Sequence, residues 1–248
     1  MPKLYAECIK LYRSVVPASV RHLIGKALPG RTGWTQAESA TGKWHVFEYE
    51  KPRWDTEYLS DKWTYLRGIQ ELSRYSVVVG YARFLHPEGS VLDLGCGEGI
   101  LQERLGSTNY RRYLGVDVSQ AAIELARSRQ NENTGFVCAD VATFVPDAPF
   151  DVIVFNEVLY YLDDPVGVMR HYERHLKPGG IFILSMFVNE QTTQNWSTLA
   201  AAYPFLDETR AGNAKSGFSW FCGVWQRAKD APAAVFADAH SARPEQPA

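Results

Sequence analysis

The stretch Ser90-Val-Leu-Asp-Leu-Gly-Cys-Gly-Glu-Gly-Ile-Leu-Gln-Glu-Arg104 decides the fold of this chain. Its apolar residues between positions 91 and 94 predict a short buried strand. Three glycines follow at alternate positions, Gly95, Gly97 and Gly99. They let the backbone turn tightly and approach a ligand without an intervening Cβ atom. A helix is expected from Ile100. Strand, glycine loop and helix predict the nucleotide-binding corner of a doubly wound α/β sheet.

Two acids distinguish this loop from a dinucleotide-binding loop. The dinucleotide pattern is G-x-G-x-x-G, whereas here the glycines read G-x-G-x-G, with Asp93 just before them and Glu98 among them. Carboxylates would repel a pyrophosphate and suit a cationic group, such as the α-ammonium of S-adenosylmethionine. Residues 91–99 resemble the first motif of the class I S-adenosylmethionine-dependent methyltransferases. The plain alternative is an ordinary glycine-rich turn between a strand and a helix.

The order of apolar runs extends the resemblance from position 90 to 187. A long helix is expected over residues 66–86, before the first strand. Further strands are expected at Tyr113–Val116, Phe136–Ala139, Phe150–Phe155 and Ile181–Phe187. Ser119 and Asp164 are expected to cap the helices that follow them, and Lys177-Pro-Gly-Gly180 to precede the fifth strand. A helix at Thr193–Tyr203 and a strand at Phe218–Trp225 complete the pattern, which ends in an antiparallel pair at the sheet edge.

The fold class is therefore expected to be a Rossmann-like methyltransferase fold: a mostly parallel, seven-stranded, doubly wound sheet with an N-terminal helical and aromatic cap. At 248 residues and 46% hydrophobic content, the chain can build one full core. We expect a cap over residues 1–65, the methyltransferase domain over 66–227, and a disordered, Ala/Pro-rich tail over 228–248.

Composition argues against several functional classes. The net charge is −2 and no long Lys/Arg run is present, which disfavours a nucleic-acid partner. The four cysteines are scattered, as in proteins of a reducing compartment. His171 and His175 stand four residues apart but lack the zincin pattern, so no metal site is expected. No transmembrane run or good signal peptide is present, and a cytoplasmic location is expected for a monomer or homodimer.

The N-terminal quarter leaves two questions open. Residues 4–28 contain two short helical patterns around Pro17; the second is either a cap helix or a basic amphipathic helix that makes peripheral membrane contact. Residues 30–65 are rich in aromatic side chains and hold four of the 7 tryptophans. These rings either pack the cap onto the sheet or contact a ligand.

The resemblance assigns cofactor-binding residues by position. Asp117, at the end of the second strand, is expected to accept hydrogen bonds from both ribose hydroxyls. The family pattern implies that Asp140 contacts the adenine amino group, that the Val141 N–H contacts the ring, and that Asp93 and Gly95 hold the amino-acid end. The remaining residues of the implied S-adenosylmethionine site are Trp63, Tyr65, Arg74, Cys96, Gly97, Val118 and Asn156.

Two further resemblances concern the methyl acceptor. Asp61-Lys-Trp-Thr-Tyr65, Glu71, Tyr75 and Glu157-Val-Leu-Tyr-Tyr-Leu162 are similar to motifs of the nodulation-factor N-methyltransferase family, which methylates the free amine of a partly deacetylated chitooligosaccharide. The first sixty residues depart from that family. Residues 11–17 look instead like methyltransferases that accompany cell-surface glycan synthesis. Both resemblances imply a small, sugar-containing acceptor.

Methyl transfer to a hydroxyl needs a general base, whereas a neutral amine needs little help. Glu157 and Tyr160 are the candidate catalytic residues by position, and each could instead be structural. Three functions remain open: methyl transfer to an O or N atom of a sugar, glycan or glycoconjugate; methyl transfer to RNA or protein; and non-catalytic S-adenosylmethionine binding by a regulatory protein.

Overall fold

The computed structural model describes residues 47–229, with side chains from residue 53 onward. Its centre is a seven-stranded sheet in the order β3-β2-β1-β4-β5-β7-β6. The strands are β1 (Glu88–Leu94), β2 (Tyr110–Asp117), β3 (Thr134–Cys138), β4 (Phe150–Asn156), β5 (Leu176–Phe187), β6 (Asp207–Asn213) and β7 (Phe218–Gln226). β1 to β5 pair in parallel, and β7 runs antiparallel to both β5 and β6. The predicted fold and the antiparallel pair at the edge are confirmed.

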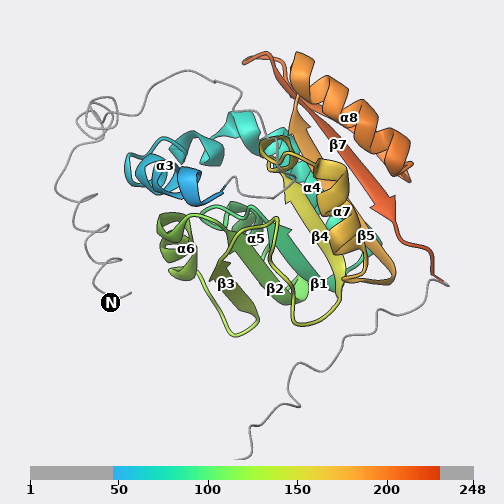
Figure 1. The fold of residues 1–248 in the computed structure, drawn as a ribbon, viewed down its shortest axis with the longest axis horizontal. Helices are drawn as coiled ribbons and strands as arrows, with labels where there is room; N and C mark the ends of the chain where they lie inside the picture. The colour runs from blue at the N-terminus through green and yellow to red at the C-terminus, as the bar shows by residue number, and fades with distance from the viewer. Residues whose placement is uncertain (1–46, 230–248) are drawn as a thin grey trace, which may run out of the picture.

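Helices cover both faces of the sheet (Figure 1). They are α3 (Phe47–Leu59), α4 (Leu72–Leu85), α5 (Ile100–Leu105), α6 (Gln120–Arg127), α7 (Pro165–Glu173) and α8 (Glu190–Ala202). α4, α5 and α6 contribute side chains to one buried cluster, and α7 and α8 to another on the opposite face. α3 belongs to neither layer and lies beside α6, at the end of the sheet where β1 and β2 terminate.

β4 shows why the sequence forms a doubly covered sheet. Ile153 and Phe155 enter the cluster under α7 and α8, while Val152 and Val154 enter the cluster under α4 and α5. All four side chains are at most 1% exposed. A strand buried on both faces needs a continuous apolar run rather than an alternating one. The same burial holds the carboxyl end of β4 rigidly at the edge where a ligand can bind.

The expected long helix over residues 66–86 is wrong in its first turns. Two 3-10 helices, Thr64–Arg67 and Ile69–Glu71, precede α4, which begins only at Leu72. Gly68 separates them in an extended conformation, with φ −70° and ψ 163°. Glycine carries a conformational cost in a helix, and here it breaks the pattern.

The boundary of β5 also differs from the expectation. Lys177-Pro-Gly-Gly180 lies within β5, where the pairing register with β4 shifts between Phe150 and Val152. Gly179 has a φ of +75°, which glycine tolerates at an irregularity of this kind. By contrast, Ser119 accepts a hydrogen bond from the Ala122 N–H and Asp164 from the Gly167 N–H, so both expected caps are confirmed.

Some expectations lie outside the described residues. These are the two helical patterns of residues 4–28 with the membrane-contact alternative, the aromatic residues before position 47, and the tail from residue 230. Within residues 47–229, no helix combines the length and the apolar character that crossing a membrane requires.

Candidate functional site

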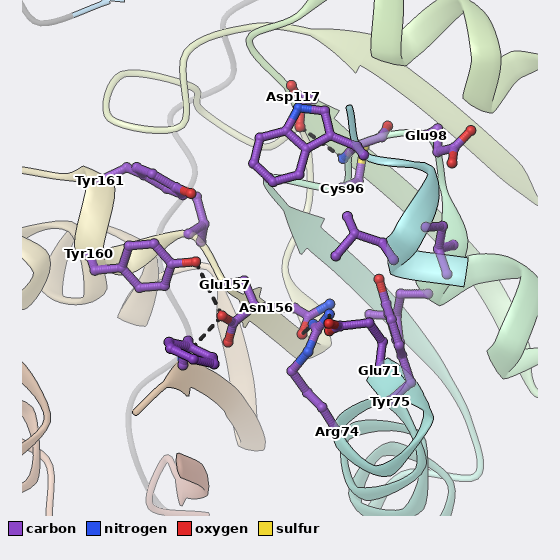
Figure 2. A pocket seen from close by; sticks show the side chains of 18 of the residues that line it. Glu71, Arg74, Tyr75, Cys96, Glu98, Asp117, Asn156, Glu157, Tyr160 and Tyr161 are labelled. Atoms are coloured by element: carbon purple, nitrogen blue, oxygen red, sulfur yellow. Dashed lines mark hydrogen bonds and ion pairs between the residues drawn. The ribbon is translucent and has the colours of Figure 1, made fainter. Parts of the chain in front are cut away.

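A pocket of about 680 Å³ lies at the carboxyl ends of β1, β2 and β4 (Figure 2). This volume is in the range of small-molecule sites. Twelve predicted site residues line it: Trp63, Tyr65, Arg74, Gly95, Cys96, Gly97, Asp117, Val118, Val141, Asn156, Glu157 and Tyr160. The structure therefore brings together residues that lie almost one hundred positions apart. Asp93 and Asp140 are not part of the lining.

The glycine loop leaves no room for a side chain at Gly95 or Gly97. Gly95 has a φ of +74°, and a Cβ atom there would lie 2.7 Å from Val158 Cγ2. At Gly97, with a φ of +54°, a Cβ atom would lie 2.6 Å from the Tyr58 hydroxyl. Both positions therefore need glycine for conformation and for space. The loop forms the floor of the pocket with its backbone.

Asp117 holds this loop from the end of β2. One carboxylate oxygen accepts the Gly97 N–H at 2.8 Å and the other accepts the Ser119 N–H at 2.9 Å. Burial raises the pKa of Asp117 to about 6, against the effect of these hydrogen bonds. A carboxylate can accept further hydrogen bonds, and Asp117 lines the pocket. It can therefore also accept two hydroxyls from a ligand.

Asp93 lies behind the loop rather than on the pocket wall. It is 1% exposed, and one carboxyl oxygen accepts the Tyr113 hydroxyl at 2.5 Å. The other oxygen, Oδ1, is buried and makes no hydrogen bond within the described residues. Burial raises the pKa of Asp93 to about 7. Oδ1 is therefore a buried acceptor that no donor among the described residues satisfies.

Asp140 and Val141 follow β3. Asp140 is half-buried, and it accepts the Ala142 N–H at 2.8 Å. Val141 contributes to the pocket lining, whereas Asp140 does not.

A buried polar cluster joins α4 to the end of β4. Arg74 is 1% exposed. Its guanidinium group donates one hydrogen bond to Glu71 at 3.0 Å and another to the Asn156 side chain. Its guanidinium carbon also lies 4.3 Å from the ring centroid of Tyr75. Arg74 Nε makes no hydrogen bond within the described part of the chain. Glu71 is not among the predicted site residues. It does occur, with Tyr75, among the motifs that are similar to those of the nodulation-factor N-methyltransferase family.

Glu157 and Tyr160 are the two candidate bases, and their geometry separates them. Glu157 accepts hydrogen bonds from the Ser185 hydroxyl at 2.9 Å, the Phe187 N–H at 3.0 Å and the Tyr160 hydroxyl at 3.1 Å. Burial raises the pKa of both residues, that of Tyr160 well above its ordinary value. Within the pair, the Tyr160 hydroxyl is the hydrogen-bond donor and the Glu157 carboxyl group is the acceptor. Figure 2 shows Glu157 between Tyr160 and Asn156.

Glu157 also has an unusual backbone. Its φ is +63°, in the left-handed region that favours glycine. The two hydrogen bonds from β5, donated by Ser185 and Phe187, hold the side chain of this strained residue in place. Strain of this kind concentrates at functional sites.

Aromatic side chains that were not predicted as site residues complete the walls. Trp54 and Tyr58 come from α3, Tyr161 follows β4, and Phe187, Phe218 and Trp220 come from β5 and β7. Trp54 meets Tyr161 edge-on, with centroids 5.0 Å apart, and lies 5.9 Å from Trp63. The tryptophan-rich segment signalled the first group, but no local pattern marks the strand residues near position 220. No cluster of His, Cys, Asp or Glu suited to a metal ion occurs among the described residues.

Comparisons with known proteins show the family to which this domain belongs. A family model described as "Methyltransferase domain" matches residues 58–219. Malonyl-[acyl-carrier protein] O-methyltransferase of Bacillus anthracis is 32% identical over 102 residues, which cover 40% of this chain and 38% of that protein. Ubiquinone biosynthesis O-methyltransferase of Coxiella burnetii is 31% identical over 119 residues, covering 46% and 50%. The chain thus spans at most about half the length of these curated relatives.

Solved structures show the same fold. N-methyltransferase NodS from Bradyrhizobium japonicum, in complex with S-adenosylhomocysteine, matches with a TM-score of 0.63 and 20% identity, covering 71% of this chain and 97% of that one. The 1,6-didemethyltoxoflavin-N1-methyltransferase of Burkholderia thailandensis matches with a TM-score of 0.61 and 18% identity, covering 77% and 94%. At these identities the likeness concerns the fold.

Proposed function

The chain belongs to the methyltransferase-domain family of class I S-adenosylmethionine-dependent methyltransferases, and from this premise we propose that it transfers a methyl group to an oxygen or nitrogen atom of a small molecule. One observation carries the proposal. A single pocket joins the glycine loop and Asp117 at one end to Glu157 at the other. A cofactor and an acceptor can therefore share it. When bound, S-adenosylmethionine supplies an electrophilic methyl group.

The residues present fit this cofactor. Asp117 would accept the ribose hydroxyls, because it lies on the wall and keeps acceptor capacity. Val118 and Val141 would contact the adenine, with Asp140 as the acceptor of its amino group. The unpaired Asp93 oxygen has the chemistry to favour the ammonium group, and the buried Arg74 guanidinium to favour the carboxylate. The proposed site is completed by Trp63, Tyr65, Gly95, Cys96, Gly97 and Asn156, which line the pocket.

The proposed acceptor is a sugar-containing small molecule, a glycan or a glycoconjugate. Tyr160, Phe187, Phe218 and Trp220 line the pocket near Glu157, and aromatic faces stack well on the apolar face of a sugar ring. For a hydroxyl acceptor, Glu157 would take the proton, since it is a carboxyl group on the pocket wall, whereas the Tyr160 hydroxyl acts as a hydrogen-bond donor to it. The aromatic walls would exclude water from the reacting atoms.

We further propose that residues 1–65 form a cap on a domain spanning 66–227. The reaction is proposed to take place in the cytoplasm. Cys96 and Cys222 are buried cysteines that form no disulfide among the described residues, which supports a reducing compartment.

The experiment that tests the function has two steps. Calorimetry first measures binding of S-adenosylhomocysteine and NAD; S-adenosylhomocysteine should bind much more tightly. An isotope-labelled methyl donor is then incubated with sugar nucleotides, amino sugars and lipid-linked glycans, and mass spectrometry should find label on one of these classes. Tighter NAD binding would overturn the cofactor, and label only on RNA, protein or a sugar-free compound would overturn the acceptor.

A further inference from the structure

Asp55, on the cap helix α3, contacts the corner of the sheet that holds Asp117. One of its carboxylate oxygens accepts the Ser119 hydroxyl at 2.7 Å and the Ala121 N–H at 3.0 Å. Ser119 is completely buried, and Ala121 belongs to the first turn of α6. The carboxylate therefore satisfies a helix N–H that has no partner within its own helix, at the end where the helix dipole favours negative charge.

Ser119 connects the cap helix α3 to Asp117, the residue at the end of β2 that lines the pocket. Its hydroxyl donates to Asp55, and its backbone N–H donates to Asp117 at 2.9 Å. The same Ser119 oxygen accepts the Ala122 N–H at 3.1 Å and caps α6. Asp117 in turn accepts the Gly97 N–H. A continuous chain of hydrogen bonds thus runs from α3 through Ser119 to the glycine loop.

The cap that Asp55 attaches forms part of the pocket wall. Trp54, the residue next to Asp55, is 9% exposed and lies in this wall. Tyr58, one helical turn further on, places its hydroxyl against Gly97. The Trp54 ring meets Tyr161, another residue of the pocket wall, edge-on. If α3 leaves α6, these two rings leave the wall with it.

We infer that Asp55 is a positioning residue for cofactor binding: it seats the aromatic wall of α3 over the glycine loop through Ser119 and Ala121. The inference rests on the proposed function, because it takes the pocket to be the S-adenosylmethionine site. Seating of the cap and ligand binding are then linked, so that each favours the other. A cap that is seated for a smaller fraction of the time lowers the apparent affinity by that fraction.

Asp55→Ala and Asp55→Asn test the inference together. Alanine removes both hydrogen bonds, whereas asparagine retains an acceptor oxygen and removes only the charge. We expect Asp55→Ala to weaken S-adenosylhomocysteine binding by about ten- to a hundredfold, with a smaller loss in Asp55→Asn. Calorimetry measures the affinity. Without added ligand, hydrogen exchange over residues 53–63 should accelerate in Asp55→Ala and stay unchanged in β4 and β5.

Glu57→Gln is the matched control. Glu57 is on the same helix and bears the same charge, but it accepts hydrogen bonds from Arg53 and Lys62, both within the cap segment. The Glu57→Gln variant should bind S-adenosylhomocysteine with an affinity within about twofold of that of the parent. An unchanged or higher affinity in Asp55→Ala, or an equal loss in Glu57→Gln, would overturn the inference.

Failure of the proposed function would give a different experimental result from failure of the inference about Asp55. The parent protein would then not bind S-adenosylhomocysteine at all, while the hydrogen-exchange comparison would still report whether Asp55 seats the cap. Exchange over residues 53–63 that is equal in the parent and in Asp55→Ala would refute the seating itself.

Discussion

Asp117 ends β2 next to the glycine loop. Its carboxylate binds two backbone N–H groups and still faces the pocket. We predict that Asp117→Ala weakens S-adenosylmethionine binding by about 1.5–3 kcal/mol, because it removes charge-assisted acceptors from the ribose hydroxyls. Calorimetry on a variant that unfolds cooperatively checks the value, and unchanged affinity would contradict the ribose assignment.

Glu157 decides between a hydroxyl and an amine acceptor. Glutamine can keep the hydrogen bonds, with its oxygen facing the Phe187 N–H and the Tyr160 hydroxyl and its amide facing Ser185. For a hydroxyl acceptor, Glu157→Gln should lower turnover by about a hundredfold or more and leave cofactor affinity nearly intact. For an amine, the loss should be small, and the rate should rise with pH as the amine loses its proton.

Steady-state kinetics across the pH range measures both outcomes for Glu157→Gln. Glu190→Gln is the control, since Glu190 is exposed in the first turn of α8. Full turnover with an unchanged pH profile would remove Glu157 as the base, and Tyr160→Phe would then be the variant to measure.

Asp93 makes stability depend on pH in an unusual direction. Burial raises its pKa from 3.8 to about 7. Between these values the folded protein holds a proton that the unfolded chain has lost, so the contribution of Asp93 to stability is full below about pH 4 and is lost as the pH rises through about 7. Asp93→Asn cannot ionise. At pH 8, without ligand, it should therefore be more stable than the parent by about 1 kcal/mol or more.

Urea unfolding at several pH values measures this difference, which should shrink towards pH 4. Asp151→Asn is the opposite control. Hydrogen bonds from Ser90 and Lys177 lower the pKa of Asp151, so its contribution is present at neutral pH and is lost as the pH falls. If Asp93→Asn were more stable than the parent by the same amount at every pH, ionisation of Asp93 would not be the cause of the difference.

At the scale of elements, residues 60–71, between α3 and α4, contribute to the pocket wall without forming a regular α-helix. The break at Gly68 leaves Tyr65 on a 3-10 turn, and Trp63 and Tyr65 pack together with their centroids 6.1 Å apart. Tyr65 is 45% exposed, so a ligand can still bury this ring. The two residues belong to the wall, and no residue of the 3-10 helix Thr64–Arg67 is buried.

We predict that this segment closes over the bound cofactor. Adding S-adenosylhomocysteine should protect the amides of residues 55–75 from hydrogen exchange, whereas the central strand β4 should stay slow with and without ligand. Mass spectrometry of peptides from this region gives the result. Equal exchange in the two states would contradict a lid.

At the scale of the whole molecule, the two buried clusters hold the sheet in place, and most ionisable side chains that line the pocket are acidic. The described lining contains four carboxylates, Glu71, Glu98, Asp117 and Glu157, and one guanidinium, Arg74, which Glu71 already neutralises. Outside the lining, Arg67 neutralises Glu98 at 3.1 Å. Glu157 has no ion-pair partner within the described residues. An anionic acceptor therefore meets repulsion in this pocket.

We predict that the protein prefers neutral acceptors to matched anionic ones. With S-adenosylhomocysteine present, a phenyl glucoside should bind at least about tenfold more tightly than the corresponding glucuronide, in which a carboxylate replaces the hydroxymethyl group. Ligand-observed NMR measures both affinities. Equal binding, or tighter binding of the glucuronide, would show that the charge of the lining does not set specificity.

The sequence by itself determined the sheet, the glycine loop and the acids at the strand ends, because these depend on local patterns. A continuous apolar run must be a buried strand, alternate glycines permit a tight loop, and a residue that ends a parallel strand lies at the binding edge. Asp117 and Glu157 could therefore be placed at this edge in advance. The break at Gly68 could not, since a helical apolar pattern continues across it.

Only the tertiary structure decided which side chains share the pocket and which are already engaged. The aromatic wall combines α3 with β5 and β7, and the link from Asp55 to Ser119 spans 64 positions. Such contacts depend on how helices pack on the finished sheet, which no local pattern encodes. Burial likewise raised the pKa of Asp93 to about 7, because desolvation acts only once the chain has enclosed the group.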